Sequence, residues 1–316
     1  MTLRNDYVGG VTWGYPGIRG TWATPDAERS MELMQTTTGA NWTAIAFCAL
    51  QAHPQATDIV YKEHPTVTDE EVRWAIGKAQ SLGLKVCLKP IVNCADGTWR
   101  AHINFFDKDV PCEPKWSDWF RSYTAFILHY ARMAEETGCQ MFCVGCELVQ
   151  TDRRAEEWRT LIAEVRKVYS GIITYNCDKY QEDNVTWWDA VDVISSSGYY
   201  PAEDWENQLG RISEAVQAAG KPFFFMEAGC PSRSGSAAIP NDWSLPGEPS
   251  EEEQAKFYRA MLESCSRREW VRGFMLWDWP AALYPLETAA GNDDYCMYGK
   301  VSAPLIKSFY LAHTGV

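Results

Sequence analysis

The chain has 316 residues, of which 46% are hydrophobic, and it carries a formal net charge of −13. A protein that neutralises phosphates needs clustered Lys and Arg, so this charge argues against nucleic acid and favours a neutral or cationic substrate. No apolar stretch approaches the length of a membrane span, and the N-terminal residues lack the apolar core of a signal peptide. We therefore expect a folded cytoplasmic protein with no membrane partner.

Apolar segments of strand length alternate along the chain with segments of helical pattern, which is typical of repeated βα units around a parallel sheet. The predicted strands cover residues 8–13, 42–49, 84–90, 140–147, 172–176, 191–198, 222–227 and 271–278. The clearest amphipathic helices cover residues 69–82, 116–137, 154–169, 205–219 and 251–267. Eight such units predict one domain, residues 1–316, of the α/β class with a (β/α)8 TIM barrel fold.

Two of the predicted connections that follow strands are unusually long. Residues 91–115 follow the third strand and residues 230–249 follow the seventh, and both are rich in Gly, Pro, Asn and Trp. Loops that follow strands form the catalytic face of a barrel. We therefore expect the functional site on this face.

Two glutamates, Glu147 and Glu227, each end a short apolar run that reads as a fully buried strand. Burying an unpaired carboxylate costs several kcal/mol, so each needs either a structural partner or a chemical task. The structural alternative is a salt bridge to a nearby Lys or Arg. Because two such strands end in the same way, we interpret the glutamates as a matched catalytic pair.

The chain contains 15 tryptophans, several of which fall at predicted strand ends or in loops. Flat aromatic rings can stack on the apolar faces of sugar rings, although core packing is the alternative for any one of them. Trp277 and Trp279 are predicted to share one face of the last strand, on either side of Asp278. The others at such positions are Trp13, Trp99, Trp187, Trp188 and Trp243. Acids and aromatic walls together predict glycoside hydrolysis.

Cofactor motifs are not found in the sequence. The five histidines form no HExxH sequence or obvious metal triad, and neither GxGxxG nor a P-loop is present. The 11 cysteines are odd in number, and many lie in apolar strand-like runs, which indicates free buried thiols. We predict no metal and no cofactor.

Several short motifs resemble glycoside hydrolase family 113, within clan A of the glycoside hydrolases, over nearly the whole chain. They are Leu88-Lys89-Pro90, Gly97-Thr98-Trp99-Arg100, Gly145-Cys146-Glu147-Leu148, Tyr199-Tyr200-Pro201, Phe225-Met226-Glu227-Ala228-Gly229 and Trp277-Asp278-Trp279. This resemblance implies an eight-fold barrel and a retaining enzyme, typically a β-1,4-mannanase. It also implies an acid/base on the fourth strand and a nucleophile on the seventh, at a separation of about 5–5.5 Å.

The resemblance assigns Glu147 as the acid/base, Glu227 as the nucleophile and Tyr199 as the tyrosine that hydrogen-bonds the nucleophile. Trp277 resembles the aromatic floor under the sugar that is cleaved. The predicted contacts to an oligosaccharide substrate further include Trp13, Lys89, Asn93, Trp99, Arg100, Asn176 and Trp279, with Asp178 facing the same mouth. For Lys89, an ion pair with a buried glutamate is an equal alternative to sugar binding.

One departure from the clan pattern bears on the substrate. Clan A enzymes commonly have Asn before the acid/base, where it binds the sugar 2-hydroxyl, whereas this chain has Cys146, a weaker hydrogen-bonding group. The resemblance still favours a β-mannoside as the substrate, and a β-glucoside, a 2-acetamido sugar or another β-linked oligosaccharide stays open as an alternative. Two other classes also stay open, namely a non-catalytic sugar-binding barrel and a metal-dependent or Schiff-base enzyme that uses Lys89.

Overall fold

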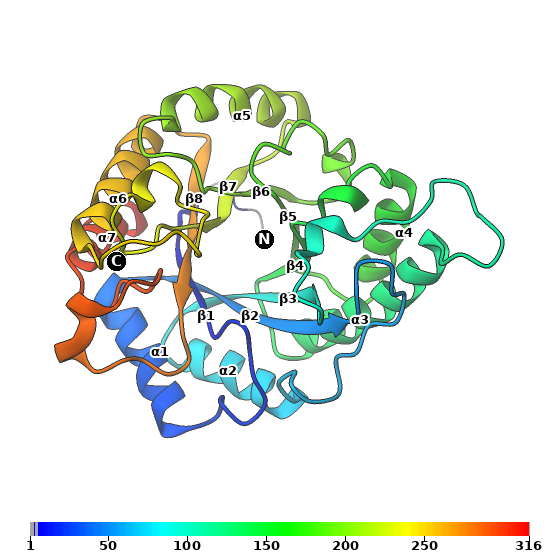
Figure 1. The fold of residues 1–316 in the computed structure, drawn as a ribbon, viewed down its shortest axis with the longest axis horizontal. Helices are drawn as coiled ribbons and strands as arrows, with labels where there is room; N and C mark the ends of the chain where they lie inside the picture. Colours follow the sequence, from blue (N-terminus) through cyan, green and yellow to red (C-terminus); the bar gives the residue numbers. More distant parts are fainter. Residues whose placement is uncertain (1–2, 4–5, 316) are drawn as a thin grey trace.

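Eight parallel strands form a closed barrel in the computed structural model, which describes residue 3 and residues 6–315 (Figure 1). Each strand pairs with the next in sequence, and β8 closes on β1. The strands are β1 Val8–Trp13, β2 Trp42–Gln51, β3 Lys85–Cys94, β4 Met141–Cys146, β5 Ile172–Cys177, β6 Val193–Ser197, β7 Phe223–Ala228 and β8 Val271–Trp279. The predicted (β/α)8 fold is confirmed.

The helices surround the barrel as an outer ring (Figure 1). Among the described residues they are α1 Pro25–Thr38, α2 Asp69–Ser81, α3 Trp116–Glu136, α4 Ala155–Arg166, α5 Trp205–Ala219, α6 Glu251–Ser266 and α7 Ser302–Thr314. Local sequence explains where several begin. Thr68 and Glu71 form a capping box at the start of α2, and the Ser250 hydroxyl accepts from the Glu253 amide at the start of α6.

The connection between β5 and β6 differs from the predicted pattern, because this part of the described chain contains turns and the short 3-10 helix η3 Trp188–Ala190 instead of an α-helix. The Trp187 ring stacks on Trp158 at 4.9 Å between ring centroids, and its indole nitrogen donates to the Asp152 carbonyl. Two tryptophans, Trp187 and Trp188, thus fill the space that a helix would cover. Both are buried core residues and not sugar-stacking residues.

Strands β2 and β3 are longer than predicted and stay paired from Trp42 opposite Lys85 to Gln51 opposite Cys94. The prediction ended the third strand at Pro90, yet Pro90 lies inside β3 opposite Phe47. The extra residues extend β3 from Pro90 to Cys94. As a result, Asn93 stands beside the cavity described below.

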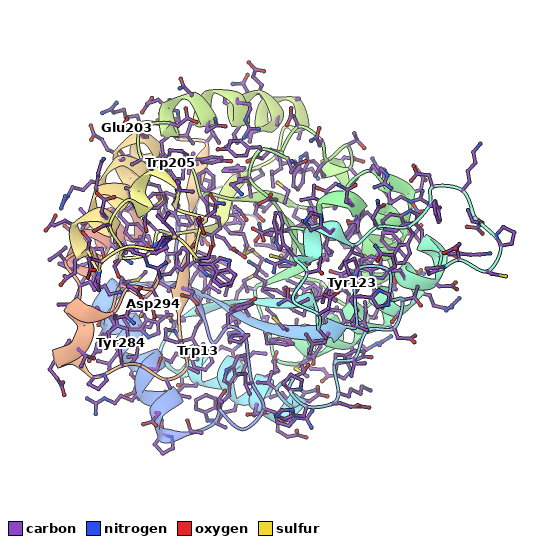
Figure 2. The ribbon with its side chains drawn as sticks, viewed as in Figure 1. Trp13, Tyr123, Glu203, Trp205, Tyr284 and Asp294 are labelled. Atoms are coloured by element: carbon purple, nitrogen blue, oxygen red, sulfur yellow. The ribbon has the colours of Figure 1, made fainter. Side chains whose placement is uncertain are left out.

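Side chains fill the inside of the barrel, and more side chains pack between the strands and the helices (Figure 2). The interior cluster comprises Leu3, Val8, Trp42, Ala44, Cys87, Met141, Cys143, Ile172, Val193, Phe224, Met226 and Met275. The outer layer is strongly aromatic, as where Trp119 stacks on Tyr123 at 4.6 Å. Because these layers close the barrel below, solvent and ligands can reach its interior at the carboxyl ends of the strands.

None of the helices in the described part of the chain is both long and apolar enough to cross a lipid bilayer.

Candidate active site

A cavity of about 790 Å³ opens at the carboxyl ends of the strands. Its lining contains both predicted catalytic glutamates together with aromatic and polar side chains. These residues are Tyr15, Asn93, Cys94, Gly97, Thr98, Trp99, Arg100, Glu147, Asp178, Lys179, Tyr199, Glu227, Asn241, Trp243, Trp277, Asp278, Pro280, Asp294 and Tyr295. An apolar cavity wall with a few convergent polar groups is the usual form of a small-molecule site.

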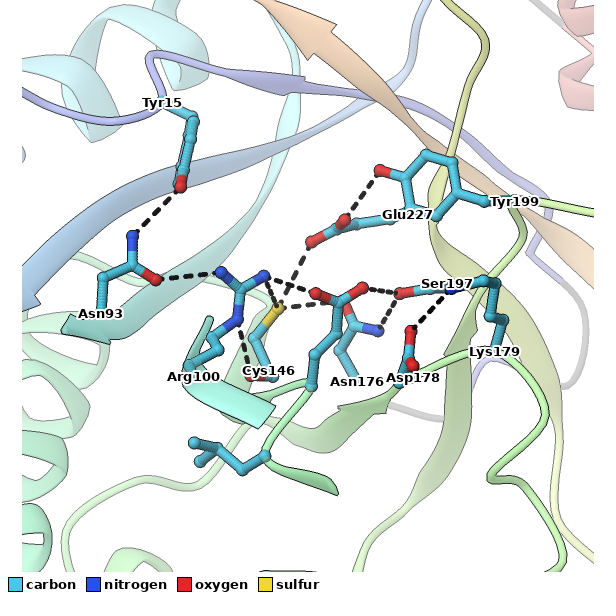
Figure 3. Close-up of polar contacts among 12 residues, drawn as sticks. Tyr15, Asn93, Arg100, Cys146, Asn176, Asp178, Lys179, Ser197, Tyr199 and Glu227 are labelled. Carbon is cyan, nitrogen blue, oxygen red and sulfur yellow. Dashed lines mark hydrogen bonds and ion pairs between the residues drawn. The ribbon is translucent and has the colours of Figure 1, made fainter. Parts of the chain in front are cut away.

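Glu227 lies near the end of β7 and is 2% exposed. Lys89 Nζ donates to its Oε1 at 2.5 Å. The Tyr199 hydroxyl donates to its Oε2 at 2.8 Å (Figure 3). Burial by itself would raise the pKa of Glu227, but the charges of Lys89 and Arg100 and the two hydrogen bonds outweigh burial and hold the pKa below its usual value. Glu227 is therefore a carboxylate at neutral pH, as a nucleophile requires.

Glu147 follows the last residue of β4 and is 6% exposed. Its φ of 50° lies in the left-handed region, which is uncommon for a residue other than Gly. The Glu147 amide donates to the Asn176 carbonyl at 2.8 Å, Ser197 Oγ donates to Oε1 at 2.7 Å, and Arg100 Nη2 donates to Oε2 at 2.6 Å. These contacts fix an otherwise unfavourable backbone conformation and aim the carboxylate into the cavity.

Cys146 directly precedes Glu147, and its thiol lies beside Glu227 (Figure 3). Its Sγ is 3.3 Å from Glu227 Oε1 and 3.5 Å from Asn176 Oδ1. Burial raises the pKa of the Cys146 thiol well above its usual value. The thiol is therefore neutral and adds a weak donor to the nucleophile.

Of the predicted substrate contacts, the structure places Asn93, Trp99, Arg100 and Trp277 on the cavity wall. Asp178 also lines the cavity, and burial, followed by the nearby charge of Glu147, raises the pKa of Asp178 to about 7. Trp277 packs against Tyr15 at 4.6 Å between ring centroids.

Lys89 and Asn176 lie beneath the cavity floor and are fully buried. Asn176 Oδ1 accepts from Lys89 Nζ at 2.8 Å, and Asn176 Nδ2 donates to Ser197 Oγ at 3.1 Å. Of the two alternatives for Lys89, the structure shows the ion pair with a buried glutamate, Glu227. The predicted contact of Asn176 with sugar is wrong, because its side chain is fully buried. Burial opposes the charge of Lys89, yet the Glu227 carboxylate raises the pKa of its ammonium, so Lys89 is not the neutral amine that a Schiff base requires.

The prediction that Trp13 and Trp279 bind sugar is wrong, because both are fully buried behind the cavity wall. Trp279 donates to the Ser30 carbonyl at 3.0 Å, and the Trp13 ring packs against Trp22. The cause is a shift of register where β1 pairs with β8, which interrupts the strand alternation and turns Trp279 away from the face of Trp277.

Several cavity residues were not predicted from the sequence, among them Tyr15, Lys179, Asn241 and Tyr295. Tyr15 could have been found, because it lies two residues beyond the end of a predicted strand. Asn241 and Tyr295 lie in the long loops after β7 and β8, where no periodic pattern in the sequence indicates which side chains face the cavity. Ser197, at the end of β6, was also missed, although its position two residues before Tyr199 offered a signal.

Comparisons with known proteins agree with this geometry. The family model of glycoside hydrolase family 113 matches residues 11–300. A search of curated proteins found no match. Among solved structures, a GH113 β-1,4-mannanase is 52% identical, with a TM-score of 0.96 over 97% of this chain and 99% of that chain.

Two further solved structures bear on the family and the fold. The GH113 β-mannanase AaManA from Alicyclobacillus acidocaldarius, in complex with ManMIm, is 44% identical, with a TM-score of 0.95 over 99% of both chains. A β-D-glucuronidase from Dictyoglomus thermophilum is 17% identical, with a TM-score of 0.66 over 96% of this chain and 50% of that chain, and shares only the barrel fold. The chain therefore belongs to glycoside hydrolase family 113 and is a glycoside hydrolase.

Proposed function

We propose that this enzyme cleaves β-1,4-mannosidic bonds with retention of configuration. The observation that carries the proposal is that Glu147 and Glu227 face one cavity from β4 and β7, while Lys89 and Tyr199 hold Glu227 as a carboxylate. Retaining glycosidases use one carboxylate as nucleophile and a second carboxyl group as acid and then base.

In the first step, a Glu227 carboxylate oxygen attacks the anomeric carbon of the sugar above it. The bond between that carbon and the glycosidic oxygen breaks, and Glu147 gives a proton to the departing oxygen. The product is a glycosyl ester of Glu227. Tyr199 and Lys89 stay beside the ester and orient the reacting carboxyl group.

In the second step, Glu147 is a carboxylate and takes a proton from water. The water oxygen bonds to the anomeric carbon, the ester bond breaks, and Glu227 leaves as a carboxylate. Two inversions at one carbon give net retention. Both enzyme groups return to their starting states.

The cavity wall favours a neutral oligosaccharide as substrate. Trp277 and Tyr15 offer apolar faces inside the cavity, and Trp99 and Trp243, exposed by 42% and 76%, offer further aromatic surface on its lining. Solved family members with 44–52% identity are β-mannanases, which favours a manno-configured sugar. Cys146 at the position where other clan members carry Asn keeps gluco and 2-acetamido substrates as competitors, so each must be assayed.

The first test is the configuration of the initial product. Proton NMR of a β-1,4-manno-oligosaccharide during hydrolysis should show the β-anomer first and the α-anomer only as mutarotation proceeds. An initial α-product would contradict double displacement. Parallel assays with cello- and chito-oligosaccharides identify the sugar.

Two variants test the roles of the acids. Glu227→Gln should abolish turnover and keep the fold, whereas Glu182→Gln, which removes a buried carboxylate paired with Arg211 outside the cavity, should keep turnover. Glu147→Ala should still react with dinitrophenyl glycosides and then stall until azide is added. Sugar binding without any turnover by the wild-type protein would instead indicate a non-catalytic sugar-binding barrel.

A further inference from the structure

Arg100 contacts Glu147, the proposed acid/base, in a way that does not favour its action as an acid. Its Nη2 donates to Glu147 Oε2 at 2.6 Å, and the side chains of Arg100 and Glu147 are only 9% and 8% exposed. A cation this close favours the ionised form of a carboxyl group, most strongly where water is excluded. The first chemical step, however, needs a proton on Glu147.

The guanidinium is anchored independently of Glu147. Its Nε donates to the Cys146 carbonyl at 3.0 Å, and its Nη1 donates to Asn93 Oδ1 at 3.0 Å (Figure 3). Asn93 in turn donates to the Tyr15 hydroxyl at 3.1 Å. Because two of its donor groups are bound to fixed partners, Arg100 stays in place when the carboxyl group of Glu147 moves.

Both oxygens of Glu147 accept hydrogen bonds in this arrangement, Oε1 from Ser197 and Oε2 from Arg100. A carboxyl group that donates its proton to a glycosidic oxygen must turn one oxygen toward the substrate. The observed arrangement therefore suits Glu147 as the base of the second step. The first step requires Glu147 to give up at least one of these contacts.

We propose that Arg100 is a positioning residue that holds Glu147 as a carboxylate base, and that the acid step begins when Glu147 takes up a proton and leaves Arg100 for the leaving-group oxygen. This inference rests on the proposed retaining mechanism. It replaces the sequence-based prediction that Arg100 chiefly binds sugar hydroxyls.

Other groups act on Glu147 from the surrounding strands and loops. The acidic groups of Glu227 on β7 and Asp178 after β5 lie near Glu147. The nearby cations have other partners, since Lys89 on β3 contacts Glu227 and Lys179 pairs with Asp178 at 3.8 Å. The neutral groups around it are Cys146 before it, Ser197 and Tyr199 on the β6 side, and Tyr295 on the loop after β8. The cation in direct contact with Glu147 is Arg100, so its removal should have the largest effect on protonation.

The test compares Arg100→Gln with Arg132→Gln, which removes an equal charge from the exposed face of α3. For an unactivated β-manno-oligosaccharide, kcat/KM falls at high pH as the general acid loses its proton. Without Arg100 this alkaline limb should move to higher pH by about 1–3 units, because an adjacent opposite charge shifts an acid by about that much. The limb of Arg132→Gln should coincide with that of the wild type.

An activated dinitrophenyl mannoside tests the base step separately, because its leaving group needs no proton. Where breakdown of the glycosyl ester limits kcat, activity falls at low pH as the base becomes protonated. In Arg100→Gln this acid limb should also move to higher pH. Arg100→Lys, which keeps the charge and loses the planar fork, should shift both limbs in the same direction by less.

Unshifted limbs together with a raised KM in Arg100→Gln would overturn the proposal and restore Arg100 as a sugar-binding residue. If Arg100→Gln does not fold, as judged by its melting temperature, Arg100→Lys carries the same test. The configuration of the wild-type product tests the proposed function separately. If the wild type gives the β-product first, the proposed function stands even when the Arg100 proposal fails. A wild-type protein that cleaves no β-glycoside, or gives the α-product first, contradicts the proposed function itself.

Discussion

Replacing Lys89 by Met should lower the free energy of unfolding, and by more at pH 7 than at pH 5, because it leaves the Glu227 carboxylate buried without its cation. In the wild type the pKa of Glu227 is lowered, so the pair stabilises the fold above the ordinary glutamate range, and this contribution is lost as pH falls through the lowered pKa. In the variant, burial dominates and raises the pKa of Glu227, so the folded state binds a proton that the unfolded state has lost.

The size of the effect follows from that proton. A folded variant that keeps this proton on Glu227 at pH 7 loses about 3.5–4 kcal/mol of stability. That pH is about 2.7 units above the ordinary glutamate pKa of about 4.3, and each unit corresponds to about 1.36 kcal/mol. At pH 5 the same cost is only about 1 kcal/mol. The pH 7 value agrees with the roughly 3–5 kcal/mol expected when one partner of a buried ion pair is removed.

Urea denaturation at pH 5 and pH 7 measures both values. Lys85→Met is the matched control, since Lys85 lies on the same strand and pairs with Asp6 at 2.7 Å, but the two side chains are 35% and 47% exposed. Such an exposed pair contributes at most about 1 kcal/mol, with little difference between the two pH values. Equal losses at the two pH values, or equal losses in the two variants, would refute the reasoning.

Three further predictions follow from the site and the core. Tyr199→Phe removes a hydrogen bond to the charged nucleophile that contributes about 1.5–3 kcal/mol, so it should lower kcat by about 10- to 100-fold and also lower the melting temperature. Trp279→Ala should lower the unfolding free energy by about 3–5 kcal/mol, whereas Trp277→Ala should chiefly raise KM, as paired denaturation and kinetic measurements would show. Burial raises the pKa of Asp152 to about 8, so wild-type stability should fall from pH 4 to pH 8 by up to about 1.4 kcal/mol per unit, and Asp152→Asn should give a flatter profile in thermal denaturation.

The sequence alone determined which segments form the barrel and where the two acids lie along it. The apolar runs that end at Glu147 and Glu227 are local patterns, and parallel strands in sequential order bring their carboxyl ends to one face. Strand periodicity and chain order therefore suffice to place both glutamates at one mouth. The hydrogen bond of Tyr199 to Glu227 was expected from the resemblance of the Tyr199-Tyr200-Pro201 motif to glycoside hydrolase family 113.

Only the tertiary structure decided which cation pairs with each acid. Lys89 reaches Glu227 across 138 sequence positions, and Arg100 reaches Glu147 from a loop, so neither contact leaves a local pattern in the sequence. Register shifts on β4 and β8 also decided which face of the strand each side chain occupies. They break the two-residue alternation on which sequence-based assignment of faces depends. For this reason Trp279 lies in the core while Trp277, two residues earlier, faces the cavity.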